Sequence, residues 1–179
     1  MRLEIHGHAI VSRDDRIADA AGFMPESLRN DADWAHFQSE LDRADLVALG
    51  RLSHEAAPKA RGRRRLVISR SAAGLEKRAD AWWWRPDALP WPEVTARLLP
   101  TGGRVAVPGG QGVFELFLEL GFAAFHLARA ERVTLPGGRG LFRGAEAGEP
   151  AERVLRRAGL APRSRTIIRS ATPPFRIRP

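Results

Sequence analysis

The sequence contains no cysteine among its 179 residues. This absence excludes disulfide bonds, thiolate metal ligands and a cysteine nucleophile. No apolar run approaches the roughly 20 residues that a membrane-spanning helix needs. The first residues also lack the charged, apolar and small-residue zones of a secretory signal peptide. We therefore expect a soluble, cytoplasmic protein that does not bind a membrane.

Several catalytic motifs are missing as well. There is no G-x-S-x-G nucleophile elbow and no HExxH zinc motif. His6 and His8 lie two residues apart on a predicted strand, but the other histidines are scattered along the sequence at His36, His54 and His126. Because metal ligands usually come in short, regular spacings, this scatter predicts no metal site.

Lysine is scarce, and arginine carries most of the positive charge. The formal net charge is +8, and residues 151–179 hold eight arginines against the single acid Glu152, which accounts for +7 of it. The basic character is therefore confined to the C-terminal segment. A nucleic-acid partner that binds these arginines is a less favoured alternative, because no basic stripe runs along the rest of the chain.

The composition is that of an ordinary globular protein, with 44% hydrophobic and 28% charged residues. A chain of this length most simply forms one domain, which we place at residues 1–179. Apolar runs alternate with helix-forming runs along most of the sequence, which predicts an α/β fold. The expected strands are 2–11, 46–49, 66–70, 80–85, the apolar run that begins at residue 104, 121–130, 165–169 and 174–178. The expected helices begin near residues 31, 53, 89, 111 and 149.

The stretch from Arg104 to Leu120 contains the most informative turn. An apolar alternating run leads into Pro108-Gly109-Gly110 and then into a helix-forming run. Open α/β sheets bind ligands where a strand ends and a helix begins, and helix N-terminal amides attract phosphate groups. The turn is thus either a plain structural turn or a contact for a phosphorylated cofactor.

Two further strand ends carry groups that bind phosphate. Arg51 and Ser53 follow the strand that ends at Leu49, and Ser53 is expected to cap a short helix. Ser69 and Arg70 end the next predicted strand. Guanidinium and hydroxyl groups at neighbouring strand ends favour an anion-binding site over solvated surface alone.

One acid, Asp33, lies in the first turn of the helix that Asn30 or Asp31 caps. Its carboxylate either stabilises the helix dipole or serves a reaction. A carboxylate in an apolar cleft has a raised pKa and can deliver a proton.

Four ordered motifs resemble the dihydrofolate reductase superfamily, which includes the reductase domain of the bifunctional riboflavin-biosynthesis deaminase-reductase. They are Asp33-Trp-Ala-His-Phe37, Gly50-Arg-x-Ser53, Arg63-Arg-Arg-Leu-Val-Ile-Ser69 and Val107-Pro-Gly-Gly-Gln-Gly-Val-Phe114. A Ser-x-Asp-x-x-Ile-Ala pattern at Ser12–Ala18 resembles the riboflavin reductase more closely. The resemblance spans roughly residues 3–142 and implies a central mixed, mostly parallel sheet flanked by helices on both faces.

The resemblance also implies NADPH as cofactor and gives each matching residue a role. The residues matched to cofactor binding are Gly50, Arg51 and Ser53 at the phosphates, Ser69 and Arg70 at the 2′-phosphate, and Gly109, Gly110, Gln111, Gly112 and Val113 at the nicotinamide and pyrophosphate. Asp33 matches the catalytic acid that assists protonation of the substrate. Arg63 matches the arginine that binds a substrate carboxylate.

Two departures from the dihydrofolate reductase pattern point away from folate itself. Ala128 stands where a threonine usually supports the acid, and Phe114 replaces a tyrosine near the nicotinamide. The sequence thus predicts an NADPH-dependent reductase of a pterin-like or ribosylaminopyrimidine-like heterocycle, in keeping with riboflavin biosynthesis and a homodimer. The alternative is a non-catalytic NADP-binding protein of the same fold.

Overall fold

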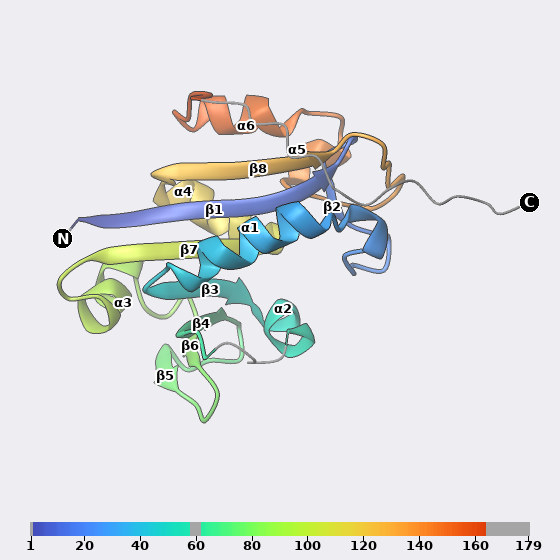
Figure 1. Ribbon diagram of the computed structural model, residues 1–179. Helices are drawn as coiled ribbons and strands as arrows, with labels where there is room; N and C mark the ends of the chain where they lie inside the picture. The colour runs from blue at the N-terminus through green and yellow to red at the C-terminus, as the bar shows by residue number, and fades with distance from the viewer. Residues whose placement is uncertain (1, 58–61, 164–179) are drawn as a thin grey trace, which may run out of the picture.

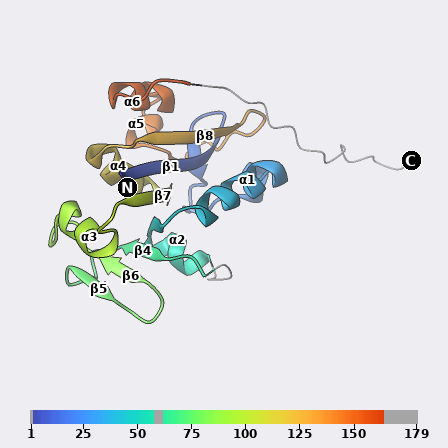
Figure 2. The same ribbon diagram turned by 60° about the vertical axis from the view of Figure 1, so that its left-hand side comes forward.

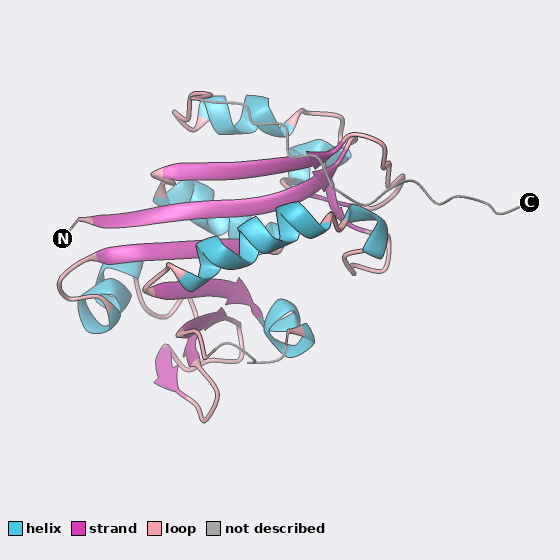
Figure 3. Ribbon diagram, in the orientation of Figure 1, coloured by secondary structure: helices cyan, strands magenta, loops and turns pink. Residues whose placement is uncertain are grey.

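The computed structural model describes residues 2–57 and 62–163, which fold around a seven-stranded sheet (Figures 1 and 3). The strand order is β5-β6-β4-β3-β7-β1-β8, and only the edge pair β5–β6 is antiparallel. The strands are β1 (Leu3–Ser12), β3 (Leu46–Gly50), β4 (Arg65–Ile68), β5 (Leu75–Lys77), β6 (Trp82–Trp84), β7 (Gly103–Gly109) and β8 (Ala124–Ala130). A separate two-stranded sheet pairs β2 (Arg16–Ala18) with β9 (Arg139–Gly140). The predicted mixed, mostly parallel sheet is confirmed.

Helices cover both faces of the large sheet, and Figure 2 shows the two helical layers on opposite sides. On one side lie α1 (Asp31–Asp42) and α2 (Arg51–Ala56). On the other lie α3 (Trp91–Leu98), α4 (Gln111–Leu120) and α6 (Ala151–Arg157). The short elements η1 (Glu26–Leu28) and α5 (Arg143–Glu146) belong to connections. No helix in residues 2–57 or 62–163 is both long and apolar enough to cross a membrane.

The main hydrophobic core fills the side of the sheet that faces α3, α4 and α6. Alternate residues of β1, namely Ile5, Ala9 and Val11, point into this core. Phe117 of α4 is fully buried there, with its ring centroid 5.2 Å from that of Trp91. The opposite face of β1 carries His6 and His8 towards α1, because successive side chains of a strand point to opposite faces.

Most predicted elements exist, and the differences have local causes. Ser53 does not cap α2, because β3 runs directly into the helix and Gly50 occupies the cap position. The three-residue β5 and the four-residue α5 are too short to produce a periodic signal. The predicted tryptophan strand is confirmed, and Trp83 and Trp84 are buried in different clusters. The predicted late strands at 165–169 and 174–178 lie outside the described residues.

Candidate functional site

The three predicted cofactor-binding segments meet at one edge of the sheet. Because β3, β4 and β7 are neighbouring parallel strands, their carboxyl ends lie side by side. Leu49 is paired with Gly109, and Gly50 is paired with Ile68. The strand ends that precede α2, Ser69 and α4 therefore form a continuous row. We call this row the carboxyl-edge cradle and define it by the predicted residues Gly50, Arg51, Ser53, Ser69, Arg70 and Gly109–Val113.

The glycine turn of the cradle requires glycine at its first position. Gly109 has a φ of +109°, and a Cβ there would lie 2.6 Å from Cε2 of Phe114. The peptide bond between Gly109 and Gly110 is cis. The amides of Val113 and Phe114 donate to the carbonyl oxygen of Gly110 at 3.0 and 2.9 Å and so begin α4. The turn therefore presents backbone rather than side chains at the head of α4.

Two residues of the glycine-rich segment serve packing. The carboxamide of Gln111 donates to the carbonyl oxygen of Gly140 and to Glu146, at 3.1 and 2.8 Å, so it is turned towards α5. Val113 is buried, and its Cγ2 lies 3.4 Å from the place of a Cβ on Gly50. Gln111 can thus offer a ligand its backbone amide, and Val113 holds the two turns together.

The polar side chains of the cradle lie near the protein surface. The guanidinium of Arg51 pairs with Glu55 of its own helix at 2.9 Å, and both side chains are about half exposed. The hydroxyl of Ser69 accepts a hydrogen bond from the amide of Ser71 at 3.2 Å. Arg70 is exposed directly beside it. These groups are accessible to a ligand that approaches the carboxyl edge.

α1 runs opposite to the parallel strands and therefore begins at the edge that carries the cradle (Figure 1). Asp33 lies in the first turn of this helix. The side chain of Asn30 caps the helix and accepts from the amides of Ala32 and Asp33 at 3.0 and 3.5 Å. Burial raises the pKa of Asp33, and the nearby His36 partly offsets this effect. Within the described residues its carboxylate makes no hydrogen bond to another side chain. It is therefore available to a ligand.

The structure does not bring Arg63 to the cradle. Its Nε donates to Asp42 at 2.8 Å, and its Nη2 donates to the carbonyl and side-chain oxygens of Gln38 at 3.0 and 2.8 Å. Only 11% of its side chain is exposed. Arg63 precedes β4, so it lies at the amino end of that strand, opposite to the cradle. Its hydrogen bonds hold the C-terminal half of α1 in place.

The Ser12–Ala18 motif forms the turn that follows β1. The hydroxyl of Ser12 donates to Asp14 at 2.6 Å and accepts from the amide of Arg16 at 3.0 Å. Asp14 also accepts from the amide of Leu135 at 3.0 Å. Burial raises the pKa of Asp14, but the hydrogen bonds and the nearby Arg16 together outweigh burial and lower the pKa below its usual value. The Ser-x-Asp spacing thus joins this turn to the loop after β8.

The interpretation of the histidines as scattered is wrong for His126. β8 pairs with β1 in parallel, and His126 lies directly opposite His8. The two imidazoles are stacked with centroids 4.6 Å apart, and His6 is 5.8 Å from His126. Burial lowers the pKa of His8 to about 3, with a further lowering from His126. No local spacing could reveal this cluster, because it depends on strand pairing.

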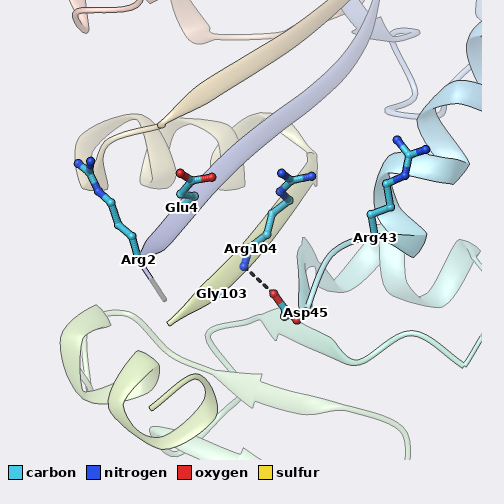
Figure 4. A pocket seen from close by; sticks show the side chains of 6 residues that line it. All are labelled: Arg2, Glu4, Arg43, Asp45, Gly103 and Arg104. Atoms are coloured by element: carbon cyan, nitrogen blue, oxygen red, sulfur yellow. Dashed lines mark hydrogen bonds between the residues drawn. The ribbon is translucent and has the colours of Figure 1, made fainter. Parts of the chain in front are cut away.

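A pocket of about 450 Å³ opens at the amino ends of the strands, away from the cradle (Figure 4). Arg43 and Arg104 extend over it together with Glu4, and the amide of Arg104 donates to Asp45 at 2.7 Å. Arg2 and Gly103 complete the lining. None of the residues predicted to bind cofactor or substrate lines this pocket.

Comparisons with known proteins give the fold. No protein-family model matches the chain, and no curated protein matches it in sequence. A solved structure from Shewanella sp. PV-4, of a protein assigned to riboflavin biosynthesis, is similar with a TM-score of 0.59 and 19% identity, over 78% of this chain and 83% of that one. A diaminohydroxyphosphoribosylaminopyrimidine deaminase/5-amino-6-(5-phosphoribosylamino)uracil reductase from Thermotoga maritima is similar with a TM-score of 0.57 and 16% identity.

The second similarity covers 80% of this chain but 48% of the Thermotoga protein, so this chain spans about half the length of the bifunctional protein. At these identities the shared property is the arrangement of the sheet and its helices. The chain therefore shares the fold of these two solved structures, and its mixed, mostly parallel sheet flanked by helices is the fold class that its motifs predicted.

Proposed function

We propose that the chain is an NADPH-dependent reductase that transfers a hydride to a ribosylaminopyrimidine-like or pterin-like heterocycle. The observation that carries this proposal is the convergence of three strand ends and one half-buried carboxylate, Asp33, at the carboxyl edge of the sheet. Ligands of open α/β sheets bind at this edge.

The cradle fits a dinucleotide in two respects. A Cβ built on Gly110 or Gly112 would meet no atom within 4 Å, so the backbone there faces open space. The first amides of the ten-residue α4 have no partner inside the helix and favour a phosphate. Arg51 can turn from Glu55 to a phosphate at small cost, because an exposed ion pair contributes only about 0–1 kcal/mol.

The bound dinucleotide would supply the hydride, and the chain would orient the substrate and handle the proton. Asp33 would be the residue that handles the proton. Because burial raises its pKa, its carboxyl group keeps a proton to higher pH than an exposed aspartate does. The substrate ring would lie between Asp33 and the glycine turn, where the carboxyl group could donate to a ring nitrogen.

Cofactor binding is the first test. Titration with NADPH should quench tryptophan fluorescence, and NADH should bind at least about 10-fold more weakly if Arg70 grips a 2′-phosphate. Gly110→Ala should weaken NADPH binding by about 10-fold or more, because the new methyl group occupies the open space of the cradle. Ala96→Ser is the control, since it also adds one atom to an exposed small residue but lies on α3, whose C-terminal end leads to the amino end of β7 and away from the cradle.

Two outcomes would contradict this proposal. If neither NADPH nor NADH binds, the proposed reductase is refuted. If Gly110→Ala and Ala96→Ser bind NADPH with equal affinity, the proposed position of the cradle is refuted. Both variants should give the circular dichroism spectrum of the parent protein. Turnover is then assayed with the riboflavin-pathway uracil intermediate and with dihydrofolate. Binding without oxidation of NADPH would favour the non-catalytic alternative.

A further inference from the structure

We propose that His6, His8 and His126 form a binding site for a divalent transition metal ion of the Zn²⁺ class, on the sheet face beside α1. This site is separate from the carboxyl-edge cradle and does not depend on the proposed reductase activity. We call these three residues the histidine triad.

Strand geometry places the three imidazoles together. His6 and His8 are two residues apart on β1, so both project from the same face, and His126 is paired with His8 on the neighbouring β8. One ring nitrogen of each residue lies within 4.8 Å of the others. Two parallel strands thus hold three ligands on a rigid support.

Two of the ring nitrogens are buried without a partner. Nδ1 of His6 and Nε2 of His8 are inaccessible to solvent and accept or donate no hydrogen bond among the described residues. His8 is only 2% exposed. A buried polar atom without a partner costs free energy, and a bound metal ion would remove that cost at both nitrogens.

The carboxylate of Glu4 favours the tautomer of His6 that a metal ion needs. Its Oε2 lies 3.3 Å from Nε2 of His6. When this nitrogen carries the proton and donates to Glu4, Nδ1 keeps its lone pair for a metal ion. Metal-ligating histidines commonly donate their other nitrogen to a carboxylate in this way.

One carboxylate near the triad favours a cation, and one arginine opposes it. Glu40 of α1 is 7% exposed and interacts electrostatically with both His8 and His126, while it also pairs with Arg43 at 2.6 Å. The guanidinium of Arg104, 4.0 Å from Glu40, acts against a positive charge at His126. His126 is exposed on the edge strand, so an ion can enter from solvent there. Phe37 packs against the His8 ring in a T-shaped arrangement, with ring centroids 6.5 Å apart, and limits access from α1.

Three imidazoles favour Zn²⁺ over Mg²⁺ or Ca²⁺, which prefer oxygen ligands. Zinc–nitrogen bonds are about 2.0–2.1 Å long, so nitrogens that bind one tetrahedral ion lie roughly 3.3 Å apart. Nitrogens that are up to 4.8 Å apart must therefore approach one another by up to roughly 1.5 Å. Rotation of the exposed His126 ring out of its stack on His8 provides this movement. Three protein ligands would leave a fourth position for water or a small anion.

The experiment measures metal binding by the full chain, prepared without an affinity tag and freed of metal with a chelator. Zn²⁺ is titrated by calorimetry, and Co²⁺ is used as a spectroscopic probe of tetrahedral nitrogen coordination. We expect one ion per chain, visible Co²⁺ absorption bands, and a rise in Tm with Zn²⁺ concentration. His126→Ala should weaken binding by more than about 100-fold, and Glu4→Gln by about 10-fold.

His36→Ala is the matched control, because His36 is an exposed histidine on α1 close to the triad but outside it. It should bind Zn²⁺ like the parent protein. Absence of Zn²⁺ binding by the parent would overturn the site, and so would binding that survives in His126→Ala. A variant His8→Gln with unchanged affinity would also overturn it. Unchanged circular dichroism spectra show that each variant folds.

Discussion

The two faces of the central sheet are built from different residues. The face towards α3, α4 and α6 is apolar, and its helices contribute large side chains such as Trp91, Phe114 and Phe117 to one continuous core. The face towards α1 and α2 has a smaller apolar cluster around Leu41. It also holds four buried polar side chains: His8, Glu40, His54 and Arg65.

The apolar face contributes mainly to stability, and the face towards α1 carries the candidate functional groups. Burial of apolar area on the α4 side provides most of the free energy of folding, because that side holds the larger core. Buried polar groups cost free energy unless they are paired. Glu40 pairs with Arg43, His54 with Asp80 and Arg65 with the carbonyl oxygen of Ala57, whereas Nε2 of His8 has no partner among the described residues. Asp33 and the histidine triad both belong to the α1 side. Substitutions on the two sides should therefore fail in different ways.

The largest effect on stability is expected for Phe117→Ala on the α4 side. This side chain is fully buried between Trp84 and Trp91, so its removal leaves a cavity. The free energy of unfolding should fall by about 3–5 kcal/mol, as measured by urea denaturation. Phe37→Ala, on the half-buried α1 side, should cost about 1–2 kcal/mol. Equal losses of unfolding free energy in Phe117→Ala and Phe37→Ala would show that the two faces of the sheet do not differ in their contribution to stability.

Asp33→Asn should reverse that pattern by removing activity at little cost in stability. If the proposed function is right, turnover of the heterocyclic substrate should fall by about 100-fold or more, because the proposed proton-handling group is gone. The free energy of unfolding should change by no more than about 0.5 kcal/mol. Asp31→Asn is the matched control in the same helical turn. Similar turnover in the two variants would assign Asp33 to the helix dipole alone.

The smallest effect concerns acid stability on the α2 side. A hydrogen bond from His54, at 2.5 Å, is the main cause that lowers the pKa of Asp80 to about 2. Since the unfolded chain then takes up the proton first, Asp80 stabilises the fold above pH 4 and loses this contribution as the pH falls towards 2. In Asp80→Asn the free energy of unfolding should depend less on pH in that window.

The control for this measurement is Asp87→Asn, which changes an exposed carboxylate in the turn before α3. It should keep the pH dependence of the parent protein between pH 4 and 2. If Asp80→Asn shows the same slope as the parent, the His54 pair does not couple protonation to folding.

The sequence predicted the central elements because their signals are local. The buried run of β3, the amphipathic α1 and the glycine turn before α4 can each be recognised within about ten residues. The prediction that Ser53 caps α2 is wrong, because no loop separates β3 from α2 and Gly50 takes the cap position. The alignment of the cradle could be anticipated, since carboxyl ends of parallel strands share an edge.

The histidine triad could not be anticipated, because it depends on the register of two strands that are far apart in sequence. His8 and His126 meet only when β8 is placed beside β1 with no residue of slip. A shift of one residue would turn the His126 side chain to the opposite face of the sheet. The contacts of Arg63 with Gln38 and Asp42 likewise arise from packing between a loop and a helix.

The contacts of Arg63 with Gln38 and Asp42 hold only the C-terminal end of α1. Arg63 fixes the helix near Asp42, while Asp33 lies nine residues away, or about 14 Å along the axis at 1.5 Å per residue. A small rotation of α1 near Asp42 therefore moves Asp33, at the other end of the helix, by a larger distance. Under the proposed role of Asp33, an Arg63 variant should lose turnover through displacement of Asp33, without any contact between Arg63 and the substrate.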